Sequence, residues 1–334
     1  MSVVYLTLFG IPAVSHIESR KQTKKTVIIT GANRGIGLAA ARRLAATNKW
    51  NVVLACRSIE LANATKQSIM EGSENVSVAQ LDLSDLKSVR NFSYQWGRKT
   101  IDCLALNAGL HTGSRTIPLR SAQGYELTVA TNHIGHFYLT KLLLGNLQRS
   151  ENGRIIVVAS SVHNANSDKK GLYDPTMGGF HGMKAGFREP FSMINGSNFN
   201  ADKAYKDSKL CNVLFTKELS RRLQADKSTI TCNSMSPGLI PTTGLFREYN
   251  TYLVGIFDFI MRNVLGIAVS EDEGGRRLAY MIESTELNGV TGAYYAKKKG
   301  TDMFIDTPVS QEARDPEVAL QLWNLTENLL KDVD

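Results

Sequence analysis

The sequence predicts one α/β domain: a doubly wound parallel sheet of about seven strands, flanked by helices. Three observations predict this fold. Short runs of β-branched and apolar residues recur along the chain, segments with helical spacing of apolar residues separate them, and a glycine-rich turn follows the first run directly. Strands that alternate with helices form a parallel sheet through right-handed crossovers. At 334 residues the chain is long for one domain, but folds of this class reach that length around a single sheet.

Seven runs are expected as strands that are buried on both faces of the sheet. They lie at residues 26–30, 51–55, 76–81, 101–106, 155–159, 229–235 and 292–296. Seven further segments have the apolar spacing of helices. These lie at residues 36–46, 59–71, 86–97, 124–147, 202–225, 271–283 and 316–330. The alternation therefore predicts a single domain over residues 25–334.

Three segments do not fit the alternation. Residues 1–24 form an N-terminal extension, which is either the remnant of an organelle-targeting segment or an extra strand or arm packed on the domain. Residues 162–200 are rich in glycine, and an insertion of this length is usually functional or mobile. Residues 244–266 are expected to form a lid rather than a transmembrane span, because Asp258 and Arg262 interrupt their apolar run. The last two segments together are expected to cover an apolar substrate.

Charge and cysteine content limit the partners. The formal net charge is +8, with basic residues densest at 21–25 and 297–299. These patches either form a solvated rim or attract phosphate, carboxylate or an anionic membrane surface. The second interpretation predicts peripheral membrane contact. Basic and aromatic residues do not interleave as in nucleic-acid binders, so no nucleic-acid partner is expected. The four cysteines form no CxxC pair, which predicts no metal site, no disulfide framework and a protein that is not secreted.

A dinucleotide site is predicted at the turn Gly31-Ala-Asn-Arg-Gly-Ile-Gly37, between the first strand and the first helix. Gly31 permits the tight turn, Gly35 lets the backbone approach a pyrophosphate, and Gly37 lets the helix pack closely on the sheet. The pyrophosphate would lie at the N–H groups of the helix N-terminus. A glycine triplet alone is a weak signal, but its place between a strand and a helix makes it specific.

The end of the second strand indicates which dinucleotide binds. NAD-dependent enzymes of this fold carry a carboxylate there, which binds the ribose 2′-hydroxyl. In this chain Cys56, Arg57 and Ser58 follow the strand, without an acid. Arg57 and Arg34 offer two guanidinium groups to a 2′-phosphate, although both could also simply face solvent. The missing acid and the two cations predict NADPH as the cofactor.

Motifs in a fixed order resemble the short-chain dehydrogenase/reductase family over nearly the whole chain. They are the glycine motif, the sequences Asn107-Ala-Gly109 and Tyr205-Lys-Asp-Ser-Lys209, and Pro237-Gly238 followed by Thr242. The resemblance implies a Rossmann-type fold and four catalytic residues, Asn132, Ser161, Tyr205 and Lys209. The cofactor-binding residues that it implies are Gly31, Asn33, Arg34, Gly35, Ile36, Gly37, Arg57, Asp82, Leu83, Asn107, Ala108, Gly109, Tyr205, Lys209, Pro237, Gly238 and Thr242.

The chemistry of the four side chains agrees with catalytic roles. Tyr205 and Lys209 are four residues apart, so they share one face of a helix. A tyrosine with its ordinary pKa of about 10 is a poor acid–base group at neutral pH, and a neighbouring ammonium favours the phenolate. Lys209 can also hold the nicotinamide ribose, Ser161 can orient the substrate oxygen, and Asn132 can hold a water in a proton relay.

The C-terminal half resembles the light-dependent protochlorophyllide oxidoreductases. The similar stretches lie at residues 192–196, 204–212, 242–248, 269–278, 309–313 and 322–323. This resemblance implies an NADPH-dependent enzyme of chlorophyll biosynthesis that binds a flat, apolar tetrapyrrole. Light would trigger hydride transfer to a ring double bond, with Tyr205 as the proton donor. It also implies a location in the plastid, peripheral to the thylakoid, and leaves a homo-oligomer open.

Departures from that family keep alternatives open. It carries Tyr-Pro-Gly-Cys where this chain has Ser236-Pro-Gly-Leu239, and CNAA where this chain has LNAG ending at Gly109. Cys211 matches a family cysteine, but a buried packing role is expected for it. One alternative is a dark, NADPH-dependent carbonyl or retinol-type reductase of an apolar substrate. The other is a non-catalytic, NADPH-binding scaffold at a membrane surface, which would have no need of the catalytic residues.

Overall fold

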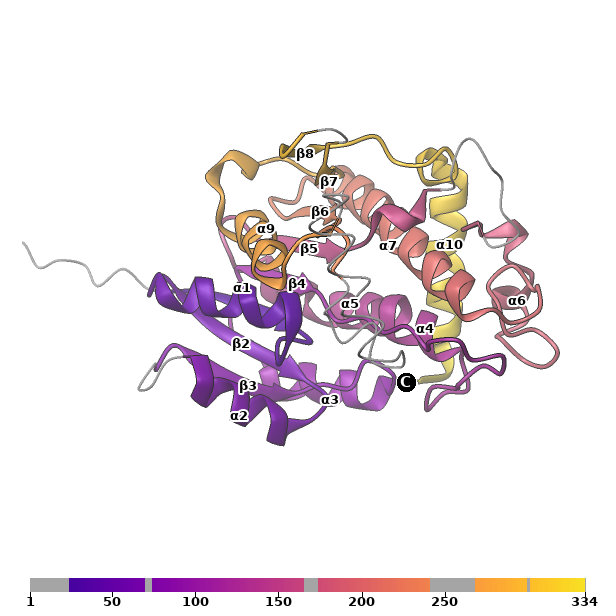
Figure 1. Cartoon of the computed structure of the whole chain (residues 1–334), viewed down its shortest axis with the longest axis horizontal. Coiled ribbons are helices and arrows are strands. Elements are labelled where there is room, and N and C mark those ends of the chain that lie inside the picture. Colours follow the sequence, from indigo (N-terminus) through magenta and orange to yellow (C-terminus); the bar gives the residue numbers. More distant parts are fainter. Residues whose placement is uncertain (1–23, 70–73, 165–173, 241–267, 299–300, 334) are drawn as a thin grey trace, which may run out of the picture.

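The computed structural model describes residues 24–69, 74–164, 174–240, 268–298 and 301–333 (Figure 1). They form one eight-stranded sheet with helices on both faces, which confirms the predicted α/β fold class. Four parts of the prediction lie outside the described residues: the N-terminal extension up to residue 23, residues 165–173 of the insertion, the lid at 244–266, and Thr242.

The strands follow one another in the spatial order β3-β2-β1-β4-β5-β6-β7-β8. Their bounds are β1 (Lys25–Thr30), β2 (Trp50–Cys56), β3 (Val76–Gln80), β4 (Cys103–Leu106), β5 (Arg154–Val158), β6 (Thr231–Met235), β7 (Tyr294–Lys297) and β8 (Phe304–Asp306). The first seven pair in parallel, as the sequence predicts. The antiparallel β8 is an addition, because a three-residue strand at the edge of a sheet has no recognisable period.

The strand order reverses beside β1. From β1 the chain builds outward through β2 and β3 on one side, and then returns to build β4 to β7 on the other. Loops that leave the carboxyl ends of β1 and β4 therefore diverge to opposite faces of the sheet. Such a switch point leaves a crevice in which open α/β sheets bind their ligands.

Two apolar cores lie on opposite faces of this sheet. One face is covered by α1 (Gly35–Ala46), α2 (Ile59–Ile69) and α9 (Glu271–Glu283). The other is covered by α3 (Leu86–Trp96), α5 (Gly135–Leu147), α7 (Ala201–Ala225) and α10 (Pro316–Leu330). Helices α1 and α9 pack closely because Gly275 has no side chain: a Cβ there would lie 2.4 Å from the Cβ of Ala39.

Helix α7 carries the predicted Tyr205–Lys209 pair. The Asn200 side chain caps its N-terminus by accepting from the N–H of Lys203 at 2.8 Å. The helix lies between the sheet and α10, where the Trp323 ring stacks on Phe215 with 6.0 Å between the ring centres. Because neighbours cover it on both sides, α7 is buried along most of its 25 residues and is a rigid support for the pair.

The predicted helix over residues 124–147 is interrupted. Gly124 has a φ of 82° and belongs to a turn, and helical structure starts only at α4 (Leu127–Val129). The carboxylate of Glu126 caps this start by accepting from the N–H groups of Thr128 and Val129. A π-helix over Ala130–Ile134 follows and leads into α5. Apolar spacing does not reveal a single wider turn, and such turns are frequent at functional sites.

Within the described ranges, no helix is both long and apolar enough to cross a membrane. The same ranges contain no group of three or more His, Cys, Asp or Glu side chains that could hold a metal ion. All four cysteines are buried free thiols.

Candidate active site

A cleft at the carboxyl ends of the parallel strands collects the predicted site residues. Its walls come from the segments that follow β1 to β6 and from α7. It is lined by every predicted cofactor residue that the structure describes, and by Ser161: Gly31, Asn33, Arg34, Gly35, Ile36, Gly37, Arg57, Asp82, Leu83, Asn107, Ala108, Gly109, Ser161, Tyr205, Lys209, Pro237 and Gly238. Asn132 lies behind the wall of the cleft. Folding thus brings together segments that are more than 200 residues apart in the chain.

The glycine turn has the backbone that a pyrophosphate site requires. Gly31 and Gly35 have φ values of 65° and 57°, which side chains rarely permit. A Cβ on Gly37 would lie 2.6 Å from the Asn107 amide and 2.8 Å from the Gly31 carbonyl, so this glycine lets two loops of the cleft meet. Among the residues that the structure describes, no side chain caps the N-terminus of α1, and its first turn contains no acid. Its N–H groups therefore fit an anion.

The charges beside the glycine turn fit a 2′-phosphate. Arg34 and Arg57 both line the cleft, and the Arg34 guanidinium is close enough to lower the pKa of the Cys56 thiol, which burial raises. Asp82 is the one carboxylate among the described lining residues, and it accepts from the backbone N–H and the hydroxyl of Ser84. The two guanidinium groups at this corner agree with NADPH.

A buried arginine holds the Pro237–Gly238 loop. The Arg277 guanidinium donates to the Pro237 carbonyl at 2.8 Å and pairs with Glu273 at 2.9 Å. A Cβ on Gly238, whose φ is 107°, would lie 3.1 Å from the same guanidinium. The loop that lines the cleft next to Leu239 is therefore fixed from behind.

Tyr205 and Lys209 lie side by side on α7. The Lys209 ammonium donates to the Val158 carbonyl at 3.0 Å and lies 5.5 Å from the centre of the Tyr205 ring. Burial lowers the pKa of Lys209 to about 8. Burial also raises the pKa of Tyr205, and this effect is larger than any stabilisation of the phenolate by the ammonium. Burial thus favours the neutral phenol, against the expected effect of the ammonium, and the phenol is the form that a proton donor needs.

The structure gives the two neighbouring serines different places. The Ser160 hydroxyl also lines the cleft, and its nearness to Tyr205 offsets part of the rise in the pKa of the phenol. Ser161, the serine predicted from the sequence, is exposed at the cleft wall, and its N–H donates to the Ser236 hydroxyl at 3.2 Å. Both serines line the cleft, so Ser160 is a second candidate beside the predicted Ser161.

The Asn132 side chain links the loop after β4 to helix α7. It is fully buried in the π-helix. Its side-chain oxygen accepts from the N–H of Leu110 at 2.8 Å, and its side-chain nitrogen donates to the Leu110 carbonyl at 3.0 Å and to the Ser208 hydroxyl at 2.9 Å. The amide thus anchors the loop after β4 to the helix of Tyr205.

His111 is a neighbour of Tyr205 that the sequence did not reveal. The two rings meet edge to face with 5.3 Å between their centres. The His111 Nδ1 accepts from the N–H of Gly113, so Nε2 carries the proton and donates to Asp202 at 2.9 Å. A lone histidine in a loop gives no sign of this contact, because the contact depends on how the loop after β4 meets the start of α7.

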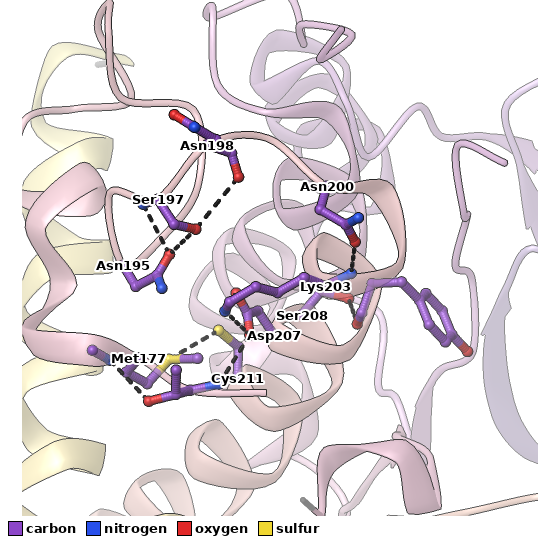
Figure 2. A network of polar contacts seen from close by, with 12 residues as sticks. Met177, Asn195, Ser197, Asn198, Asn200, Lys203, Asp207, Ser208 and Cys211 are labelled. Carbon is purple, nitrogen blue, oxygen red and sulfur yellow. Dashed lines mark hydrogen bonds and ion pairs between the residues drawn. The ribbon is translucent and has the colours of Figure 1, made fainter. Parts of the chain in front are cut away.

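The insertion docks on the back of the same helix (Figure 2). The Asp207 carboxylate accepts from the Lys203 ammonium at 2.7 Å and from the N–H of Thr176 at 3.0 Å. The Cys211 thiol donates to the sulfur of Met177 at 3.7 Å, so this cysteine packs, as expected. Burial raises the pKa of Asp207 to about 7 against the opposing effect of the ammonium. One face of α7 therefore presents Tyr205 and Lys209 to the cleft, while another holds the insertion.

Comparison with known proteins agrees with this geometry. The family model described as short chain dehydrogenase matches residues 25–195. The chain is 38% identical to the chloroplastic protochlorophyllide reductase of Cucumis sativus, over 96% of this chain and 82% of that protein. The protein of the same name from Chlamydomonas reinhardtii is also 38% identical, over 95% and 80% of the two chains. Among solved structures, an uncharacterized protein from Mycobacterium paratuberculosis is similar with a TM-score of 0.66 and 28% identity, over 92% and 93% of the chains.

Fold and cleft together define a nicotinamide-dependent oxidoreductase that acts on a small molecule. The chain belongs to the short-chain dehydrogenase/reductase family, and within it to the group of the protochlorophyllide reductases. This membership confirms the prediction of an enzyme with NADPH as its cofactor, and the chloroplastic relatives confirm a plastid location. The alternative of a non-catalytic scaffold is thereby set aside.

Proposed function

We propose that the chain reduces protochlorophyllide with NADPH, by light-driven hydride transfer to a ring double bond. The observation that carries the proposal is the placement of Tyr205 beside Lys209 at the wall of the cleft. It occurs in a chain that is similar over 96% of its length to a protochlorophyllide reductase.

Each group of residues has a task in this reaction. NADPH, when bound, supplies the hydride. The glycine turn holds its pyrophosphate, Arg34 and Arg57 hold its 2′-phosphate, and Pro237 and Gly238 hold its nicotinamide end, with Thr242 in the same role. Lys209 holds the nicotinamide ribose, and Tyr205 gives its proton to the reduced ring of the substrate. Ser161 orients the substrate, and Asn132 supports the relay that returns a proton to Tyr205.

The apolar wall of the cleft suits a flat pigment. Leu110, Val162 and Leu239 line it, and none of the four cysteines is among the lining residues that the structure describes. Tyr205 therefore carries the proton transfer without a thiol. In this proposal the insertion at 162–200 and the lid at 244–266 cover the substrate, and residues 1–24 are an extension outside the catalytic domain.

The test is spectroscopic. Protein purified with NADPH and protochlorophyllide in the dark is expected to show a red-shifted pigment band, which converts to the product band on a light pulse. Tyr205→Phe is expected to bind the pigment and not convert it. Absence of conversion in the wild-type protein, with NADPH demonstrably bound, would overturn the proposal.

A second candidate rests on Ser236 and Leu239, which replace the Tyr and Cys of the light-dependent family. It is a dark reductase of apolar carbonyl compounds that uses the same Tyr205 and Lys209. Steady oxidation of NADPH with retinal-like carbonyls in darkness, without pigment conversion in light, would select it.

Peripheral contact with the thylakoid surface and a homo-oligomeric state complete the proposal. The basic residues at 297–299 motivate the membrane contact. Flotation with vesicles of anionic lipid and the mass of the NADPH-bound protein in solution test these two points.

A further inference from the structure

His136 is a buried histidine to which the proposed reaction gives no task. It lies in α5, directly after the π-helix, with 2% of its surface exposed. It contacts Thr30, which directly precedes the glycine turn at the end of β1, and Asn132, a predicted catalytic residue in the π-helix.

The neighbours of His136 fix which ring nitrogen carries the proton. Its Nδ1 lies 3.2 Å from the Asn132 carbonyl, which can only accept, so Nδ1 is protonated. Its Nε2 lies 2.9 Å from the Thr30 hydroxyl, which accepts from the N–H groups of Asn107 and Ala108. The other acceptor within reach of this hydroxyl, the Ala105 carbonyl, is farther away at 3.4 Å, so Nε2 is the better acceptor for its proton. Burial and the Lys209 ammonium lower the pKa of His136 to about 3, so the ring stays neutral. Both nitrogens of a single neutral tautomer are thus engaged.

The hydrogen bonds continue on both sides of His136. On one side, Thr30 directly precedes Gly31 and holds the loop after β4 through its two accepted N–H groups. On the other, the Asn132 side chain donates to Ser208, whose hydroxyl donates to the Tyr205 carbonyl at 2.7 Å. One unbroken series of bonds therefore joins the glycine turn to the helix of Tyr205, and His136 is its central member.

We propose that His136 is a positioning residue that couples the two loops of the NADPH site to Asn132 and, through it, to the Tyr205 helix. This rests on the dinucleotide site of the proposed function, but not on the identity of the substrate. Loss of the imidazole removes these partners from the buried Asn132 carbonyl and Thr30 hydroxyl, and leaves Thr30 the more distant Ala105 carbonyl as an acceptor. The glycine turn after β1 and the loop after β4 then lose their hydrogen-bonded link to Asn132.

His133 is a matched control. It lies in the π-helix one turn earlier, with 1% of its surface exposed, and burial lowers its pKa to about 3 as well. Its ring packs against Phe137 and Phe215, and its Nε2 hydrogen-bonds to Thr326 of α10 at 2.9 Å. Its contacts thus lead away from the cleft, so a change there removes an equally buried histidine without touching the series.

The test compares His136→Leu with His133→Leu. The Kd for NADPH is measured by fluorescence titration without substrate, and thermal unfolding gives the loss of stability. His136→Leu is expected to weaken NADPH binding about 5- to 150-fold, the range expected for a buried group left unpaired. His133→Leu is expected to lower the unfolding temperature with the Kd within about twofold of wild type. Equal Kd values for the two variants would overturn the proposal.

Two further measurements decide the matter if His136→Leu does not fold. His136→Asn places an amide N–H near the position of Nδ1 and is expected to restore part of the NADPH affinity, because it can still donate to the Asn132 carbonyl. In the wild-type protein, ¹⁵N spectra of labelled histidine are expected to show His136 protonated on Nδ1, with a signal that moves when NADPH binds. A His136 protonated on Nε2 would contradict the proposed geometry. Neither measurement requires turnover, so a failure of pigment conversion would overturn the proposed function alone.

Discussion

The ammonium of Lys209 is held between the carbonyl of Val158, to which it donates at 3.0 Å, and the ring of Tyr205, whose centre is 5.5 Å away. The bond to Val158 ties α7 to the end of β5, directly before the Ser160–Ser161 turn. The same strand end therefore fixes the lysine and the serines around the Tyr205 hydroxyl. Few conformations of α7 would keep all of these groups in contact.

Tyr205→Phe removes a single oxygen atom and is expected to lower kcat by about 10²- to 10⁴-fold, the usual contribution of a positioned proton donor. The Kd for NADPH and the unfolding temperature should stay close to wild type, because the ring still packs against His111. Tyr125→Phe is the control, since the Tyr125 hydroxyl bonds to the Leu329 carbonyl and lies outside the cleft. Near-normal single-turnover rates in Tyr205→Phe would show that the proton comes from another group.

The lowered pKa of Lys209 predicts a limit to activity at alkaline pH. The charge of Lys209 is complete below about pH 7 and is lost as the pH rises through about 8. We therefore expect kcat to fall with an apparent pKa of about 8. A profile that stays flat to pH 10 would contradict a role for the charged form.

The same pKa predicts a pH dependence of stability. Between pH 8 and 10.5 the unfolded chain keeps the proton of Lys209 that the folded chain has lost, so stability rises with pH across this window. Lys209→Met removes this contribution in the cofactor-free protein. The change in the free energy of unfolding that the substitution causes should therefore be about 3 kcal/mol more stabilising at pH 7 than at pH 10.5. Urea unfolding of both proteins at the two pH values measures the difference, in which the titration of other groups cancels.

Arg57→Ala is expected to reduce the preference for NADPH over NADH by about 10- to 150-fold, the contribution of one charge-assisted contact. Affinity for NADH should change little, because its ribose lacks the phosphate. Arg42→Ala removes an exposed arginine of α1 that does not line the cleft, and it should leave both affinities unchanged. Equal binding of the two nucleotides by the wild-type protein would refute the assignment.

Asp207→Asn leaves the buried ammonium of Lys203 without its counter-ion and is expected to destabilise the fold by about 3–5 kcal/mol at pH 8. Glu218→Gln is the matched control on the same helix. Glu218 is equally buried, but its partners Arg221 and Arg222 reach solvent, so the loss should be smaller. The double variant Lys203→Met/Asp207→Leu should recover much of the lost stability. Chemical unfolding of the four proteins checks this order.

Leu239→Cys restores the thiol that the light-dependent family usually carries. Because Tyr205 alone serves as the proton donor in the proposed reaction, this variant should keep or raise light-driven turnover. Val162→Cys is the control, since it places a thiol elsewhere on the wall of the cleft. Single-turnover absorbance in pulsed light compares the three proteins. A large loss of conversion confined to Leu239→Cys would show that the leucine itself shapes the pigment site.

The sequence alone determined the fold class, because the alternation of apolar strands and helices is a local property that the order of residues carries. It also predicted where the cofactor turn lies, because a glycine triplet between a strand and a helix is a specific signal. Seven of the eight strands lie where they are expected. The exceptions are physical as well: β8 is too short to have a period, and the π-helix around Asn132 changes the turn without changing the apolar pattern.

Only the tertiary structure decided which groups meet in the cleft. Ser160 comes near Tyr205 because of the conformation of one turn, and His111 lies against the Tyr205 ring because the loop after β4 meets the start of α7. The protonation states of Tyr205 and Lys209 depend on burial, which is set by the packing of the whole domain. Spacing along the chain shows which side chains share a helix face. The residues packed against that face come from other parts of the chain, and they determine the protonation state of each group.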